Sequence, residues 1–294
     1  MLNSKRFRAF AVSALLGCLA TPARAADGFN AQFLAPAAAG AGWLTQDNLA
    51  LSGPLGGAVA LTTGYAHNPV SSGSTVVMSD LATANIGFAI HYSRFRLSAD
   101  LASPLFVRGP GVPSLDIASH PDTITDVRIA LDARLWGDVD GPLRLGLGAQ
   151  LFVPSADRSD YMSDGSYRGQ LRVKAAGDVG AVRYAANVGY HVRPLQGDEV
   201  VYGAAIGWRL ELADALHALV VGPEAFGALN LHSQQAWEAL LAARVELANG
   251  PSHVLRFKLG AGAGGGDLPG AAQWRVVAGV EVVGLATAAT VSGE

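Results

Sequence analysis

Apolar and polar positions alternate with a period of two along most of this chain, most clearly between residues 143 and 193. Apolar or small residues stand at every second position of 143–153, 167–175 and 182–192, and mostly charged, polar or glycine residues stand between them. A period of two places these two sets on opposite faces of a β-strand. Repeated alternation over about ten residues is typical of strands that cross a bilayer at a tilt.

The same alternation predicts twelve strands, an even number as in bacterial single-chain barrels. They are expected at 57–66, 82–92, 94–103, 125–136, 143–154, 167–179, 181–193, 199–212, 216–228, 237–248, 253–262 and 273–284. Connections after the even-numbered strands are short, and most of those after the odd-numbered strands are longer. Short periplasmic turns and longer outer loops are the asymmetry of outer-membrane barrels. We therefore predict an all-β fold, a transmembrane antiparallel up-and-down β-barrel of about twelve strands, over its alternative, a very large sandwich.

Aromatic residues gather near the ends of the predicted strands. One group lies at the ends assigned to the outside and the other at the periplasmic ends: Tyr65, Phe152, Tyr167, Tyr190, Tyr202, Phe226, Trp237 and Trp274, then Tyr92, Phe95 and Trp136. Two such girdles are what a set of bilayer-spanning strands should display. A general preference of aromatic residues for strands would not sort them to the strand ends.

The composition supports a membrane location. A mean hydropathy of +0.27 is high for an ordinary soluble domain, and only 15% of the residues are charged. No stretch after the N-terminal leader approaches the roughly 18 uncharged apolar residues that a membrane helix needs. The net charge of −3 argues against a nucleic-acid partner, which needs a basic face.

The N-terminus carries the features of a signal peptide over residues 1–25. Basic residues precede an apolar run at 9–20, and Ala23-Arg24-Ala25 matches an A-x-A cleavage site. The alternative is a lipoprotein leader cleaved at Cys18. We expect export to the bacterial outer membrane, then an irregular segment at 26–56 on the periplasmic side or partly inside the barrel. The barrel itself is expected at 57–284 and a C-terminal tail at 285–294.

Charged residues of the strands fall on the face opposite the apolar one. A charge facing lipid costs about 2–4 kcal/mol at the midplane, so these groups should line the lumen. The predicted lumen-lining residues are Arg128, Asp132, Arg134, Arg144, Arg168, Arg172, Lys174, Arg183, Asn187, Arg209, Glu211, Glu224, Glu238, Arg244, Arg256, Lys258, Arg275 and Glu281. Basic groups outnumber acidic ones, and an open lumen of that sign favours anions. The alternative is that these groups pair across the lumen and fill it, since twelve strands lie between filled eight-stranded barrels and wide porins.

Four segments together resemble a known class of barrel: residues 80–88, 185–193, 197–203 and 274–280. They are similar to the outer-membrane barrel regions that precede an OmpA-type peptidoglycan-binding domain in larger bacterial proteins. The resemblance implies an outer-membrane barrel and identifies no reaction. Only ten residues follow the last predicted strand, so we expect that domain to be absent and contact with peptidoglycan to be doubtful.

Motifs for chemistry are weak in this sequence. Residues 260–265 match G-x-G-x-x-G, but no helix pattern follows, so a flexible loop is expected rather than a dinucleotide site. Asp157, Asp160 and Asp164 share one outer loop, but their spacing fits no calcium loop. We expect no cofactor, no metal and no catalytic residue. The expected function is a passive pore or transporter for small solutes, in contact with outer-membrane lipid and lipopolysaccharide. The alternatives are a non-conducting structural barrel and, less favoured, a membrane-embedded hydrolase.

Overall fold

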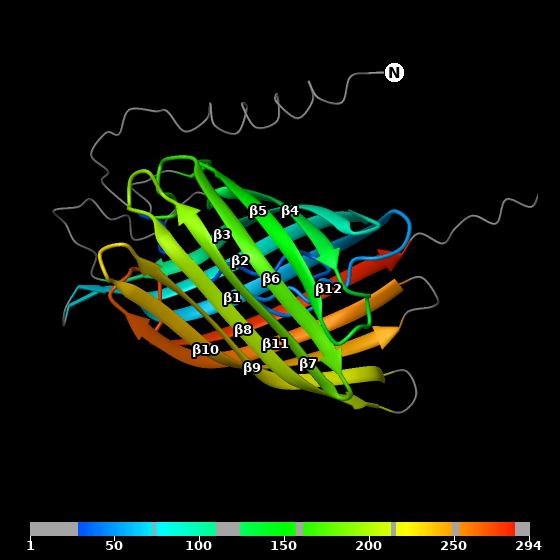
Figure 1. Ribbon diagram of the computed structural model, residues 1–294. Coiled ribbons are helices and arrows are strands. Elements are labelled where there is room, and N and C mark those ends of the chain that lie inside the picture. The colour runs from blue at the N-terminus through cyan, green and yellow to red at the C-terminus, as the bar shows by residue number, and fades with distance from the viewer. Residues whose placement is uncertain are drawn as a thin grey trace, which may run out of the picture.

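Twelve antiparallel strands close into a single barrel (Figure 1). The structure, a computed structural model, describes residues 29–72, 75–109, 124–156, 161–212, 216–248 and 253–285. The strands are β1 (Gly56–Ser72), β2 (Thr75–Tyr92), β3 (Phe95–Arg108), β4 (Val127–Trp136), β5 (Arg144–Val153), β6 (Arg168–Val179), β7 (Val182–Val192), β8 (Glu199–Glu211), β9 (Leu216–Asn230), β10 (Gln235–Ala248), β11 (His253–Gly266) and β12 (Trp274–Leu285). Each strand pairs with its sequence neighbours, and β1 pairs with β12. The predicted all-β barrel of twelve strands is confirmed, while the predicted leader and nearly all of the predicted tail lie outside the described residues.

The period-two pattern sorts side chains to the two faces of the wall. Leu171 in β6 and Val188 in β7 are 65% and 52% exposed on the outer face. Arg144 in β5 and Lys174 in β6, on the alternate positions, are 1% and 5% exposed. An apolar exterior around a polar interior is the reverse of a water-soluble barrel and matches a wall that faces lipid. Among the described residues, no helix is long and apolar enough to cross a membrane.

The two ends of the barrel differ in their connections. Ser93 and Arg94 alone join β2 to β3, and Gly180 with one further residue joins β6 to β7. Ser93 and Gly180 adopt φ values of 55° and 58°, which a two-residue turn of this kind requires. We call this the short-turn end and the opposite one the long-loop end. The predicted asymmetry is present only in part among the described connections, because residues 137–143 join β4 to β5 at the short-turn end and residues 231–234 join β9 to β10 at the long-loop end.

Several strands continue further toward the long-loop end than the sequence predicted. The expected loop at 67–81 is wrong, because β1 and β2 stay paired up to Ser72 and Thr75, with register shifts between His67 and Ser71. Strand pairing beyond the apolar belt needs no lipid-facing alternation, so the period-two signal fades there while the hydrogen bonds persist.

The glycine-rich stretch 260–265 is likewise not a loop but part of β11. A Cβ on Gly262 would lie 1.9 Å from the backbone oxygen of Ala239, so the close approach of β10 requires glycine there.

Residues 29–55, which we call the lumenal segment, run through the inside of the barrel; their deep-blue trace lies within the ring of strands (Figure 1). At the long-loop end, the Ala31 N–H donates to the backbone oxygen of Tyr161 at 2.9 Å. At the short-turn end, the backbone oxygen of Gly53 accepts from the N–H of Ser93 at 2.9 Å. The segment therefore spans the lumen from one end to the other before β1 begins.

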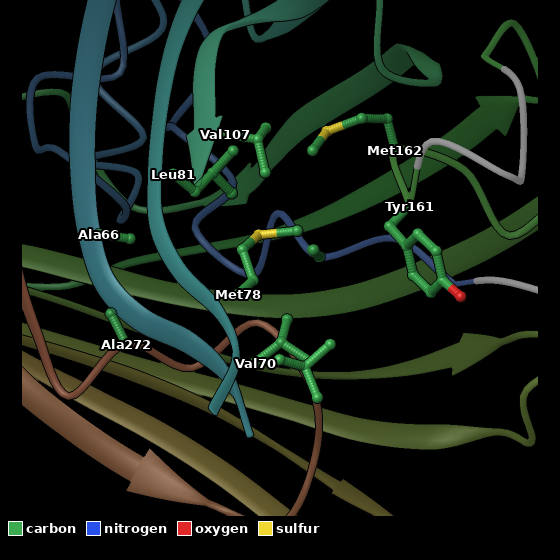
Figure 2. Packing of buried hydrophobic residues seen from close by; sticks show 10 residues of the cluster. Ala66, Val70, Met78, Leu81, Val107, Tyr161, Met162 and Ala272 are labelled. Atoms are coloured by element: carbon green, nitrogen blue, oxygen red, sulfur yellow. The ribbon is translucent and has the colours of Figure 1, made fainter. Parts of the chain in front are cut away.

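A cluster of buried apolar residues packs under the long-loop end (Figure 2). It joins the lumenal segment, strands β1 to β3, the β5–β6 connection and the β11–β12 connection; its members are Ala31, Ala66, Val70, Val77, Met78, Leu81, Val107, Tyr161, Met162 and Ala272. Phe29 packs against it, with its ring centroid 4.8 Å from that of Tyr161. The cluster ties the start of the lumenal segment to the barrel wall.

Candidate functional site

The lumen is the part of the molecule where polar chemistry is concentrated. Most residues predicted to line it are buried there: Arg128, Asp132, Arg134, Arg144, Arg168, Lys174, Glu224, Glu238, Lys258, Arg275 and Glu281. Six others are half-buried: Arg172, Arg183, Asn187, Arg209, Arg244 and Arg256. Glu211 differs from the expectation, because β8 ends there at the rim and its side chain is 71% exposed beside Arg209.

Basic groups of the wall bind the backbone of the lumenal segment. Four of them donate to its carbonyl oxygens: Arg128 to Pro36 at 2.5 Å, Arg134 to Leu51 at 2.8 Å, Arg244 to Gly42 at 2.8 Å and Lys258 to Trp43 at 3.1 Å. An irregular segment has no ladder to satisfy its own carbonyl groups, and buried ones need partners. Basic side chains of the strands therefore bind the lumenal segment directly.

Acidic groups of the wall complete this arrangement by accepting from backbone N–H groups. The carboxylate of Glu224 in β9 accepts from the N–H groups of Leu44 and Thr45, both at 2.9 Å, and from the Thr45 hydroxyl at 3.0 Å. Glu281 in β12 accepts from the Gly40 N–H at 2.9 Å and pairs with Lys258 at 2.9 Å. Carboxylates bound to N–H groups make charge-assisted hydrogen bonds, which are stronger than neutral ones.

Four charged side chains meet in the middle of the lumen; we call them the central tetrad. Asp47 of the lumenal segment and Asp132 of β4 both contact Arg96 of β3 and Lys174 of β6. The distances are 2.7 Å for Arg96–Asp132, 2.8 Å for Lys174–Asp47 and 2.5 Å for Lys174–Asp132. Two carboxylates and two cations are thereby paired inside the barrel.

Sequence reasoning placed Lys174 and Asp132 in the lumen but did not single out Asp47. Its segment was expected on the periplasmic side or partly inside the barrel, but it has no period-two pattern that would mark single residues as buried. One carboxylate in an irregular stretch is indistinguishable from a solvated one until the path of the segment is known.

Asp164 is bound to arginine at the long-loop end. Its carboxylate lies 2.8 Å from Arg193 and 3.4 Å from Arg168, and it accepts from the Asn30 N–H at 2.9 Å. Although burial raises the pKa of Asp164, the two guanidinium groups lower it below the ordinary value. Of the loop aspartates weighed as calcium ligands, residues 157 and 160 lie outside the described residues. Within the described ranges, no three His, Cys, Asp or Glu side chains are grouped to hold a metal.

A cavity of about 130 Å³ lies between the lumenal segment and the inner faces of β5 to β9. Its polar lining includes Asn30, Gln32, Gln46, Arg168, Gln170, Arg172, Asn187, His191, Arg193 and Glu199. Phe33, Phe152 and Phe226 supply an aromatic part of the same lining. The cavity is therefore both cationic and partly apolar.

Two aromatic residues expected in the outer girdle line this cavity instead. Phe152 stacks with the guanidinium of Arg168, 4.5 Å from the ring centroid, and Phe226 lies 5.6 Å from Phe33. Both occupy inward-facing positions of their strands. A position near a strand end therefore did not predict which face of the wall these two side chains lie on. Of the other girdle aromatics, Tyr65 is half-buried and the rest, among them Tyr92, Trp136 and Trp274, are exposed on the outside.

Comparisons with known proteins identify the fold. No known protein family matches the chain by its sequence profile, and no curated protein matches its sequence. A solved outer-membrane channel described as COG4313, from Pseudomonas putida F1, aligns over 79% of this chain and 96% of its own, with 14% identity and a TM-score of 0.52. The NanC porin aligns over 78% of this chain and 100% of its own, with 10% identity and a TM-score of 0.47.

The chain therefore has the fold of bacterial outer-membrane β-barrels, a class that includes channels and porins. At these identities the likeness shows the fold alone. The comparisons show no link to OmpA-type proteins, so the resemblance read from the sequence is supported only at the level of an outer-membrane barrel.

Proposed function

We propose that this protein is an outer-membrane channel for small solutes whose own lumenal segment holds it closed in the state described. The exposed apolar belt, with Leu171 and Val188 facing outward, suits contact with lipid and lipopolysaccharide. The long-loop end then faces outward and the short-turn end faces the periplasm.

The observation that carries this proposal is the way the lumenal segment is held. Its backbone is bound through hydrogen bonds to charged wall groups such as Arg244 and Glu224, and through the ion pairs of Asp47. A wall of charged side chains can be wetted when the segment moves, whereas an apolar interior would stay dry. The excess of basic groups on that wall favours anions once water enters.

A planar-bilayer experiment with two variants tests the proposal. Glu224→Ala removes three hydrogen bonds to the lumenal segment, and Glu211→Ala is the matched control at the exposed rim. Under a potassium chloride gradient, we expect a mostly closed wild-type protein and an open fraction about tenfold higher in Glu224→Ala, since 1.4 kcal/mol changes an equilibrium tenfold. The reversal potential should favour chloride. A permanently silent Glu224→Ala barrel with a demonstrably loosened segment would reject the channel.

The second candidate is a structural barrel that never conducts. The pairing of lumen charges favours it: Arg275 contacts Glu238 at 2.7 Å, and Glu238 also accepts from the Ala272 N–H at 2.8 Å. Such contacts fill the lumen without any role in transport. Under this alternative, loosening the segment should lower stability and leave conductance absent.

A further inference from the structure

Arg172 is the charged lumen residue whose position the fold does not explain. Its inward-facing neighbours on β6, Arg168 and Lys174, each contact carboxylates. Within the described part of the chain, Arg172 has neither an ion-pair contact nor a hydrogen bond to its side chain. A guanidinium kept inside a protein without a partner is costly, so its retention points to a role outside folding.

The neighbouring strands leave room for the Arg172 side chain. Arg172 lies opposite Gly148 of β5 and Gly189 of β7. A Cβ on Gly189 would lie 2.7 Å from Cγ of Arg172, so the aliphatic stem crosses the space that glycine leaves open. The side chain thereby reaches the 130 Å³ cavity that it lines.

Other polar atoms around this cavity also lack partners. Among buried side-chain atoms of the described residues, Gln170 Oε1, His191 Nε2 and the Nε atoms of Arg168 and Arg172 accept or donate no hydrogen bond. Buried polar atoms are nearly always bonded, so unsatisfied atoms on several residues that line one cavity point to a polar ligand there. Two of these residues, Arg168 and Arg172, present guanidinium donors, which suit an anion. The Nδ1 atom of His191 faces Glu199 at 3.5 Å, so the Nε2 atom of the neutral ring is an acceptor.

The aromatic part of the cavity lining indicates that the ligand also has an apolar part. Phe33, Phe152 and Phe226 line the cavity and present apolar surface. Glu199, the acidic residue among the cavity-lining groups, is paired with Arg193 and lies 3.5 Å from His191. The carboxylates that act on Arg172 from a distance, Asp47 and Asp132, are paired with the two cations of the central tetrad, so none of these three carboxylates is left for Arg172. One uncompensated guanidinium matches one negative charge rather than the two or more of phosphate.

We propose that this cavity is a binding site for a small monocarboxylate with a compact apolar body, held through its carboxylate by Arg172. A guanidinium binds a carboxylate through two parallel hydrogen bonds, and the aromatic wall contacts the remainder. The site deepens the proposed channel function, on which its role as a transport subsite rests. Ligand binding can be measured without measuring conductance. The binding site and the channel function can therefore be disproved independently of each other.

The test uses the whole mature protein folded in detergent and two probes of the same shape. Binding of benzoate and of its neutral counterpart benzamide is measured by saturation-transfer NMR at constant ionic strength. We expect saturable binding of benzoate and binding of benzamide at least about tenfold weaker, since hydrogen bonds to charged groups exceed neutral ones. Equal binding of benzoate and benzamide would overturn the assignment of a carboxylate ligand. This comparison uses the wild-type protein alone.

Variants then locate the site. Arg172→Gln should weaken benzoate binding about tenfold, and Arg172→Lys should retain part of it. Arg183→Gln, at the short-turn end beside Asp178, is the matched control and should bind as the wild type does. Unchanged binding in a folded Arg172→Gln barrel would overturn the proposal. Inorganic phosphate that displaces benzoate at equal concentration would also overturn it, because the site would then recognise charge alone. Benzoate binding in a barrel that never conducts would reject the channel and leave the binding site standing.

Discussion

The carboxylate of Glu224 accepts a hydrogen bond of 2.9 Å from the backbone N–H of Leu44, a residue 180 positions earlier in the chain. Both groups are buried inside the barrel. The contact joins the ninth strand to a segment that precedes the first, so it exists only once the barrel is closed around that segment. It illustrates how the wall and the lumenal segment stabilise each other.

Glu224→Ala should lower the stability of the folded barrel. The change leaves the N–H groups of Leu44 and Thr45 without their acceptor, at about 1–3 kcal/mol for each buried unsatisfied group. Urea unfolding in detergent should therefore show a lower midpoint. Glu211→Ala, at the rim, should unfold as the wild type does. Equal midpoints for the two variants would contradict the assigned position of the lumenal segment.

The central tetrad predicts a compensating pair of substitutions. Lys174→Met leaves the carboxylates of Asp47 and Asp132 sharing Arg96 alone, and breaking a buried ion pair on one side costs about 3–5 kcal/mol. Adding Asp47→Asn removes the excess negative charge and should recover part of that loss. A double-mutant cycle on unfolding free energies measures the coupling. Simple additivity of the two changes would show that the tetrad does not act as a unit.

The in/out register predicts which substitutions block assembly. Leu147→Arg and Val188→Arg place a charge on the exposed apolar face, at about 2–4 kcal/mol each near the midplane. Both should reduce folded barrel in membranes, as read from heat-modifiable migration on gels. Asn187→Ala, one position from Val188 on the inner face, should assemble normally.

Arg144→Ala is an intermediate case that only the structure identifies. The sequence predicts tolerance, but Arg144 is buried and contacts Asp178 at 3.2 Å as well as the Val139 carbonyl oxygen. We expect insertion with a lower unfolding midpoint, since one member of a buried pair is lost. Failure to insert would indicate that this end forms early in assembly.

Acidification should loosen the lumenal segment only at low pH. The pKa of Asp164, which binds the Asn30 N–H, lies below the ordinary value of 3.8 in the folded protein, because Arg168 and Arg193 outweigh the effect of burial. A lowered folded-state pKa gives stabilisation that is complete above the ordinary value and is lost as pH falls through the lowered one. Hydrogen exchange of peptides from 29–55, corrected for intrinsic pH dependence, should match at pH 7 and 5 and accelerate below about pH 4. Acceleration already between pH 7 and 5 would point to a histidine instead.

The orientation of the barrel is tested by cysteine labelling on intact cells. His232, between β9 and β10, is exposed at the long-loop end, and Asp140, between β4 and β5, is exposed at the short-turn end. A membrane-impermeant maleimide should label His232→Cys directly and Asp140→Cys only after the outer membrane is permeabilised. The reverse pattern would invert the proposed orientation.

The strand pattern was readable from the sequence because it is local. Alternation of Leu147 with Gly146 and Gly148, or of Val188 with Asn187 and Gly189, follows from one requirement, an apolar outer face and a polar inner one. That requirement acts on every strand within the apolar belt, so twelve strands and their two faces could be predicted. It stops acting beyond the belt, which is why the outer extensions of β1 and β2 were missed.

What the lumen contains was decided by the tertiary structure alone. The segment 29–55 carries no periodicity, and Asp47 meets Arg96, Asp132 and Lys174 only because the closed barrel brings four distant parts of the chain together. Arg172 and Lys174 look equivalent along β6, both basic and both on the inner face. Lys174 is neutralised by carboxylates and Arg172 opens onto a cavity, and that difference depends on which side chains face each residue across the lumen. Such partners are set by barrel closure and by the path of the lumenal segment, neither of which the alternation along a strand encodes.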